Sequence, residues 1–303
     1  MNLETLISLL GIYLFIAVGF GAKWTFKKQI DDRTITLLSV YFLQIFLTFW
    51  GLLKRPIDTD LLFAPSIYLA ITLMALLLMI PLSRLLFSDT KERSIATVSA
   101  LIGNTGNLGI PLGIAMFGEQ SVPYMTLINL VNVFVVYTIG VFYYSRGEFS
   151  VRDSLLNILK IPVLWAAMVA IALNLIGYQP SEAVDKTLMM GAYASMTMQL
   201  VLFGIYLYGI KLGELNVKLS LWISSAKFIL IPALAWIVLG QIQMDGMVKG
   251  MVFLELIVPL AVANVNLASL YNCAPRTVTI QVFVTSVLFL GIAFILPLIL
   301  RLF

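Results

Sequence analysis

The sequence predicts an all-α integral membrane protein with ten transmembrane helices, arranged as two inverted repeats of five helices. Three observations predict this class. Of the 303 residues, 61% are apolar and only 11% are charged, too few to cover a water-soluble surface. Apolar runs of about 20 residues, long enough to cross a bilayer, recur between short charged segments. The fourth and ninth runs have polar centres broken by glycine or proline, at equivalent places in the two halves.

The apolar runs form one transmembrane domain, residues 1–303. The first run begins at Leu3 with no positive charge before it, so we expect a first span and not a signal peptide. The longest connection, 145–159, separates a first five-helix repeat (1–144) from a second (158–303), which the odd number of spans inverts. The expected spans are 4–22, 34–53, 61–87, 95–117, 121–144, 158–177, 187–210, 219–240, 248–270 and 277–302.

The basic residues predict the orientation of these spans. Numbered in order, the odd loops hold 13 of the 19 lysines and arginines, whereas the even loops and the C-terminal tail hold five. Cytoplasmic loops of membrane proteins carry the excess of positive charge. We therefore expect the odd loops in the cytoplasm and both termini outside it, in a plasma or inner cell membrane.

Composition excludes several classes of function. Histidine is absent and Cys273 is the only cysteine, so a metal cluster, a Cys-His nucleophile or an internal disulfide cannot be built from this chain. Well inside the spans there is no aspartate and one glutamate, which argues against an intramembrane enzyme. A phosphate-binding Gly-x-x-x-x-Gly-Lys loop is also missing, which disfavours a primary pump. We expect no enzyme activity, no cofactor, no metal and no nucleic-acid partner.

The two broken spans carry the candidate binding residues. Span 4 places Asn104 and Thr105 in a run of three glycines that ends at Pro111, and span 9 places Pro259, Asn264 and Asn266 at a similar depth. Backbone freed from a helix at that depth must be buried in protein or line a wet cavity. Paired breaks of this kind point to a transporter binding site. The alternative is that the glycines permit close packing and the asparagines bond between helices.

The same residues carry a resemblance to a known family. Residues 104–111 match the pattern Asn-Thr-Gly-x-x-Gly-Ile-Pro of the auxin efflux carrier family, and residues 259–271 keep the first Pro, Ala-Val, Leu-Ala and Tyr of its ninth-span pattern. Leu260 replaces the second proline of that pattern, and the asparagine falls at 264 instead of 263. In these motifs the chain resembles the auxin efflux carriers, and the likeness of pattern extends over all ten spans.

The resemblance implies a bile acid sodium symporter type of fold, in which spans 4 and 9 unwind and cross near the membrane centre. It implies small organic anions, such as auxin or dicarboxylates, as substrates, and a homodimer by analogy. Carried over by motif position, Asn104 and Thr105 lie at the first crossover and Pro259 and Leu260 at the second. Asn264 and Asn266 follow about one to two turns later on the second half-helix.

Two charged residues fall well inside spans. Glu255, one turn before Pro259, is interpreted as a protonatable or cation-binding coupling group, or as a carboxylate that reaches the interface or stays neutral beside a neighbour. For Lys227 we favour a side chain that snorkels to the interface, with pairing to Glu255 or attraction of an anion as alternatives. Gln44 and Gln199, which match between the halves, line the cavity or form interhelical hydrogen bonds.

These observations favour a secondary transporter that moves a small organic anion by alternating access in the lipid membrane. A cation-coupled symporter of another amphipathic solute, or a channel, is the alternative, because broken helices also line pores. The sequence leaves open the substrate, the direction of transport, the coupling ion (proton or sodium) and the oligomeric state.

Overall fold

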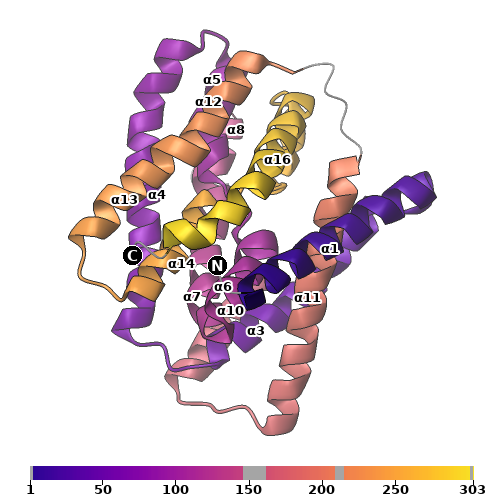
Figure 1. Ribbon diagram of the computed structural model, residues 1–303, viewed down its shortest axis with the longest axis vertical. Coiled ribbons are helices and arrows are strands. Elements are labelled where there is room, and N and C mark those ends of the chain that lie inside the picture. Colours follow the sequence, from indigo (N-terminus) through magenta and orange to yellow (C-terminus); the bar gives the residue numbers. More distant parts are fainter. Residues whose placement is uncertain (1–2, 146–161, 209–214, 301–302) are drawn as a thin grey trace. The chain divides into compact units, whose positions relative to one another are not determined.

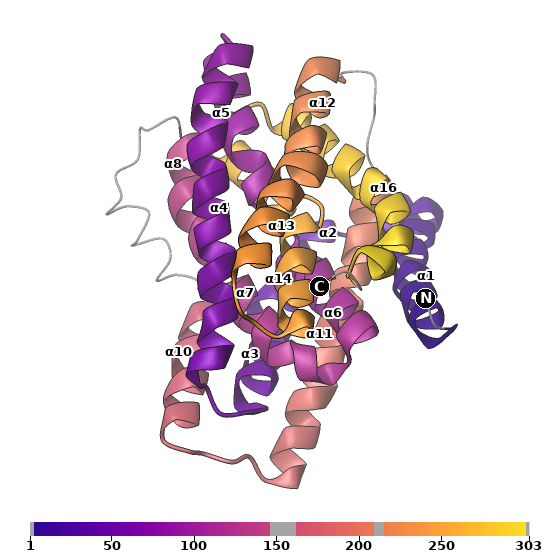
Figure 2. The same ribbon diagram turned by 60° about the vertical axis from the view of Figure 1, so that its left-hand side comes forward.

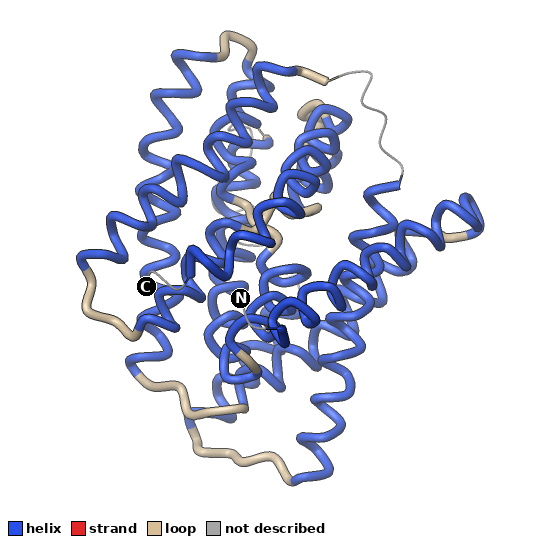
Figure 3. Tube along the Cα trace, viewed as in Figure 1, coloured by secondary structure: helices blue, strands red, loops and turns tan. Residues whose placement is uncertain are grey.

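The computed structural model describes residues 3–145, 162–208, 215–300 and 303. Within these ranges the regular secondary structure is helical, with loops between the helices, and there is no β-strand longer than a single bridge (Figure 3). Contacts divide the chain into two compact units, which are described separately. The first comprises residues 1–63, 106–130 and 159–210, and the second comprises residues 64–105, 131–158 and 211–303.

The first unit is built on two long helices that pack closely. These are α1 (Leu3–Phe26) and α11 (Glu182–Tyr208). A Cβ atom added at Gly204 of α11 would lie 1.9 Å from the carbonyl oxygen of Ile16 of α1. A Cβ atom added at Gly19 of α1 would lie 1.9 Å from the carbonyl oxygen of Val201 of α11. Only glycine fits such an approach of two backbones, which Figure 1 shows for α1 and α11. The helices of this unit are α1 (Leu3–Phe26), α2 (Asp32–Leu37), α3 (Gln44–Leu53), α6 (Ile110–Phe117), the first part of α7 (Val122–Val135), α10 (Pro162–Leu175) and α11 (Glu182–Tyr208).

The second unit holds the remaining helices around one apolar core. Helices α12 and α13 join through a π-helical turn, Ala226–Leu230, and lie beside α4 in Figures 1 and 2. The buried core includes Ile102, Leu260 and Leu267, which come from segments far apart in the sequence. The helices are α4 (Thr59–Leu86, in this unit from Ala64), α5 (Thr90–Val98), the end of α7, α8 (Val141–Tyr144), α12 (Val217–Ser225), α13 (Ile231–Gln241), α14 (Gly246–Ile257), α15 (Ala263–Leu270) and α16 (Pro275–Leu300).

Several of these helices suit a membrane. Six helical segments among the described residues are long and apolar enough to cross one by length and composition: Asp32–Leu53, Thr59–Leu86, Glu119–Tyr144, Glu182–Tyr208, Val217–Gln241 and Pro275–Leu300. Large apolar side chains on them are exposed, such as Leu77 at 68% and Ile237 at 63%. Exposed apolar surface on this scale fits lipid as the solvent. A multi-pass α-helical membrane protein, the coarser part of the predicted fold class, is therefore confirmed.

The finer prediction, ten spans in two inverted repeats, stays a prediction. Each predicted span contains helix, and spans 1, 2, 6 and 7 all contribute their helices to the first unit. The division does not follow the two halves throughout, because residues 106–130 of spans 4 and 5 belong to the first unit whereas spans 9 and 10 lie in the second. Parts of the prediction lie outside the described residues, namely nearly all of the central connection 145–159 and the ends of spans 6, 7 and 10.

Candidate functional site

Both predicted helix breaks are present. Residues 99–105 of the first break and the whole of the second break belong to the second unit. Helix α5 ends at Val98, a 3₁₀ turn follows over Ser99–Leu101, and helical structure resumes as a π-helical turn at Thr105–Gly109 before α6. Helix α14 ends at Ile257 and α15 begins at Ala263. Pro259 has no amide hydrogen to donate to a helix, so a break at this place follows from the sequence.

The backbone groups freed at the two breaks form hydrogen bonds with each other. Gly103 and Leu260 form an antiparallel β-bridge. On either side of it, the amide of Asn104 donates to the carbonyl oxygen of Pro259 at 2.8 Å, and the amide of Ala261 donates to that of Ile102 at 3.0 Å. Polar backbone groups buried away from water need such partners. Residues 102–105 and 259–261 are called the crossover below.

Asn264 ties the crossover to a neighbouring helix. Its side-chain nitrogen donates to the carbonyl oxygen of Ile102 at 3.1 Å, and its side-chain oxygen accepts from the hydroxyl of Tyr144 at 2.9 Å. The Tyr144 hydroxyl also lies 3.0 Å from that of Ser99. All three side chains are buried, with Asn264 at 0% exposure. Asn264 is thus a structural brace of the crossover in this conformation.

A second polar brace comes from α7. The side-chain nitrogen of Asn132 donates to the carbonyl oxygen of Gly103 at 2.9 Å and to the hydroxyl of Thr105 at 3.0 Å. Its oxygen accepts from the hydroxyl of Tyr68 at 3.1 Å. The predicted site residue Thr105 is therefore held by the protein itself. Thr105 is 1% exposed and belongs to this buried network.

Lys227 places a buried amino group at the crossover. It lies in the π-helical turn between α12 and α13 and is 2% exposed. Its ammonium donates to the carbonyl oxygen of Ala100 at 3.1 Å, and a Cβ atom added at Gly103 would lie 3.1 Å from it. The favoured interpretation of Lys227 as a snorkelling side chain is wrong. A snorkelling lysine extends its amino group to the membrane surface, whereas the amino group of Lys227 is buried inside the protein.

Three more polar side chains are buried here without satisfied hydrogen bonds. Both carboxyl oxygens of Glu255, both polar atoms of the Gln281 amide and the side-chain nitrogen of Asn104 have no hydrogen-bond partner among the described residues. Glu255 lies within electrostatic range of Lys227. The interpretation in which Glu255 reaches outward is wrong, since its exposure is 0%. Buried polar groups left unpaired cost stability, and their retention calls for a functional explanation.

Other predicted site residues do not join this cluster. Asn266 is exposed, although it lies only two positions after Asn264. Gln44 and Gln199 belong to the first unit. There Gln199 donates to the hydroxyl of Ser195 at 3.0 Å and its own oxygen has no partner.

Sequence reasoning passed over three buried polar residues of the second unit. Asn132 in span 5, Tyr144 at its end and Gln281 in span 10 are buried polar groups in apolar helices. The signal that would have found Asn132 and Gln281 is their polarity in the middle of long apolar runs, where amide side chains bond between helices.

Comparison with known proteins shows the family of this chain. The family described as membrane transport protein, which is the family of the auxin efflux carriers, matches residues 5–299. The chain belongs to this family. An uncharacterized transporter of Methanocaldococcus jannaschii is 24% identical over 287 residues, which cover 91% of this chain and 92% of the relative. Membership makes the protein a membrane transporter. Residues 104–105 and 259–261 of the two motifs belong to the crossover.

Proposed function

We propose that this auxin efflux carrier family member is a secondary transporter that moves a small organic anion across the cell membrane by alternating access. The anion's charged group binds at the crossover. The observation that carries the proposal is the Lys227 ammonium, buried beside Gly103 where the two helices break. A carboxylate bound at this point would favour the charged form of Lys227, because opposite charges attract strongly in a medium of low dielectric.

The hydrogen-bond donors that the crossover offers to an anion come mainly from side chains and not from backbone amides. A broken helix exposes amide groups and roughly half a positive charge at its new N-terminus. Two of the amides here, those of Asn104 and Ala261, already donate across the crossover. The side-chain nitrogen of Asn104, buried and unpartnered among the described residues, is free to donate to a ligand. Lys227 and Asn104 together offer a cation and a neutral donor to one carboxylate.

Charge balance links the anion to a second ligand. An uncompensated buried charge costs about 3–5 kcal/mol. When Glu255 is ionised, it offsets the charge of Lys227 within electrostatic range. When Glu255 takes up a proton, or its charge is met by a sodium ion, the ammonium is left for the substrate carboxylate. Binding of the organic anion and of the proton or cation would then favour each other, which is the thermodynamic basis of coupled transport.

Binding measurements on the purified protein test the anion site. Removing one polar partner from such a site costs about 1–3 kcal/mol, so Asn104→Ala is expected to weaken affinity for the transported organic acid by about ten-fold. Asn107→Ala is the matched control, because Asn107 lies in the same glycine-rich segment at a variable position of the family motif. Unchanged affinity in Asn104→Ala, or an equal loss in both variants, would contradict the site.

Counterflow separates a carrier from a channel. In vesicles preloaded with one organic acid, a carrier exchanges it for a labelled external acid and saturates, whereas an open pore does neither. A panel of mono- and dicarboxylates in this assay would also identify the substrate.

A further inference from the structure

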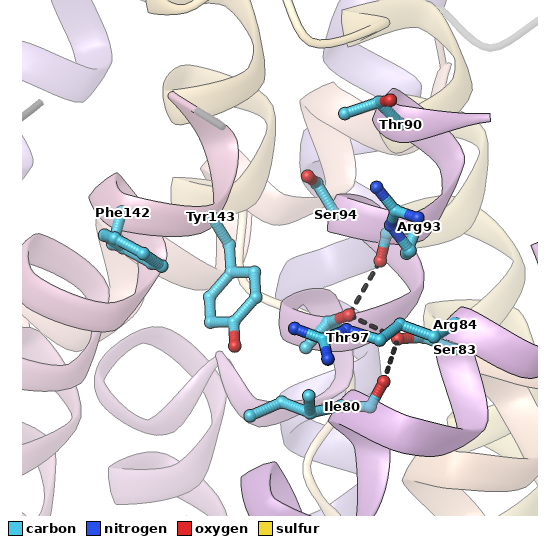
Figure 4. Close-up of a pocket in the computed structure, with 9 residues that line it drawn as sticks. All are labelled: Ile80, Ser83, Arg84, Thr90, Arg93, Ser94, Thr97, Phe142 and Tyr143. Atoms are coloured by element: carbon cyan, nitrogen blue, oxygen red, sulfur yellow. Dashed lines mark hydrogen bonds between the residues drawn. The ribbon is translucent and has the colours of Figure 1, made fainter. Parts of the chain in front are cut away.

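A second polar pocket lies in the second unit, away from the residues of the crossover. It has a volume of about 420 Å³ and is lined by side chains from α4, α5 and α8. Figure 4 shows Arg84 of α4 and Arg93 of α5 with Tyr143 of α8 at its side. The pocket is large enough for a headgroup or small organic ligand, not only an ion.

Two guanidinium groups contribute to the lining of this pocket. Neither Arg84 nor Arg93 forms a side-chain ion pair or hydrogen bond with the described part of the chain. The acids of the same segment are occupied elsewhere: Asp89 accepts from the backbone amides of Lys91 and Glu92 at the start of α5, and Glu92 accepts from Asn216 at 2.7 Å. The pocket therefore keeps a net positive charge and favours an anion.

Free hydroxyl groups accompany the arginines. Thr90 and Ser94 line the pocket, and their hydroxyls have no hydrogen bond to the described residues. By contrast, the hydroxyls of Ser83 and Thr97 bond to each other at 2.6 Å and to backbone carbonyls, and so form a fixed wall (Figure 4). Two guanidinium groups with two hydroxyl donors suit the several oxygens of a phosphate group.

Exposed apolar side chains lie in and near the segments that line the pocket. Phe142 lines the pocket and is 47% exposed, and Leu85, next to Arg84, is 81% exposed. Further along α4, Leu77 is 68% exposed. Positions 77 and 84 lie two turns apart on one helical face, so Arg84 ends an apolar face of a candidate membrane span. A ligand that satisfies both surfaces is anionic at one end and apolar at the other.

We propose that this pocket binds the phosphate group of an anionic phospholipid, whose acyl chain lies along the exposed face of α4. The charge pattern predicts that Arg84 and Arg93 lie on the cytoplasmic side. Basic pockets between transmembrane helices on that side are suited to anionic headgroups. The lipid site is distinct from the crossover and does not depend on which solute is transported.

Native mass spectrometry of the full-length protein tests the site with two lipids of identical acyl chains, phosphatidylglycerol and phosphatidylcholine. We expect phosphatidylglycerol to bind with at least ten-fold higher affinity. Arg84→Gln combined with Arg93→Gln is expected to remove that difference. Arg33→Gln, the same change at an exposed arginine on the predicted cytoplasmic side outside the pocket, is expected to keep it.

A competition with inorganic phosphate and a second variant complete the test. If inorganic phosphate at millimolar concentration displaces phosphatidylglycerol or raises the thermal unfolding midpoint equally well, the pocket binds a free anion and the lipid proposal is overturned. Equal binding of both lipids, or an equal loss in Arg33→Gln, overturns it as well. Should the glutamine variant fail to give folded protein, the double Arg→Lys variant keeps the charge and the predicted topology. It is expected to lower phosphatidylglycerol affinity several-fold, because lysine lacks the paired donors of arginine, and unchanged affinity would contradict the site.

Discussion

The backbone amide of Asn104 donates to the carbonyl oxygen of Pro259 across 2.8 Å, so main chain from the two halves of the sequence meets directly at the two helix breaks. The polar side chains around this contact are of two kinds. Both polar side-chain atoms of Asn132 and of Asn264 have hydrogen-bond partners, on the backbone of the crossover and on neighbouring hydroxyls. By contrast, Asn104 and Glu255 retain polar atoms without hydrogen-bond partners among the described residues. The first pair is structural, and the second is where we expect ligands.

Asn264→Ala is expected to lower stability by about 1–2 kcal/mol, the usual contribution of a hydrogen bond between membrane helices. The change removes the donor to Ile102 and the acceptor for Tyr144. Asn266→Ala is the matched control on the same helix, because Asn266 is exposed and its loss is expected to change stability by less than about 0.5 kcal/mol. Thermal unfolding of both variants in the same detergent measures the difference. Equal midpoints would show that Asn264 does not brace the crossover.

Gly103→Ala is expected to fold but to weaken substrate affinity. The added Cβ would lie 3.1 Å from the Lys227 ammonium and 3.2 Å from a methyl group of Val258, so both must move by a few tenths of an ångström. Gly291→Ala provides the control, because an added Cβ there has no neighbour within 4 Å. Direct binding measurements compare the two. A loss of affinity in Gly291→Ala as large as that in Gly103→Ala would point to a general effect on the fold.

Glu255→Gln is expected to abolish the dependence of transport on pH or on the coupling cation, because a neutral amide cannot bind a proton or offset Lys227. Transport at different external pH values and sodium concentrations, measured in vesicles for parent and variant, provides the readout. If Glu255→Gln keeps the parent's dependence on both, Glu255 has no role in coupling. Lys227→Gln in the same assay is expected to raise the substrate KM, since it removes the cation and leaves Glu255 unbalanced.

The orientation of the chain can be measured with single cysteines in a Cys273→Ala background, in which the one native cysteine, itself buried, is absent. Glu182→Cys lies in a predicted external loop and is expected to react with an impermeant reagent added outside intact cells. Lys28→Cys lies in a predicted cytoplasmic loop and is expected to react only after the membrane is opened. Both native side chains are exposed, so accessibility within the protein is comparable. The opposite pattern of labelling would reverse the predicted topology.

The sequence was informative about the breaks for a simple physical reason. Glycine and proline act on their own backbone, so the ends of α5 and α14 and the pairing partners near Asn104 and Pro259 could be anticipated from local residues and from the family motif. The prediction of a membrane transporter rested on the same motif together with overall composition. Both are properties that need no knowledge of side-chain direction.

Side-chain direction is what local sequence does not determine. Two positions along a helix differ by about 200°, so Asn264 and Asn266 point to different sides, and choosing between them requires knowing which face of α15 is buried. Lys227 shows the same limit. A long stem can lead its charge either outward or inward, and the inward direction follows from the place of the π-helical turn beside Gly103.

The bridge between Gly103 and Leu260 also restricts how the transporter can work. The two backbone hydrogen bonds beside it and the bond from Asn264 to Ile102 would all have to break if one broken segment slid along the other. In a dry interior those groups would find no water to replace their partners. The two segments should thus travel as one rigid block, and the gating step of a transport cycle must come from hinges elsewhere in the chain.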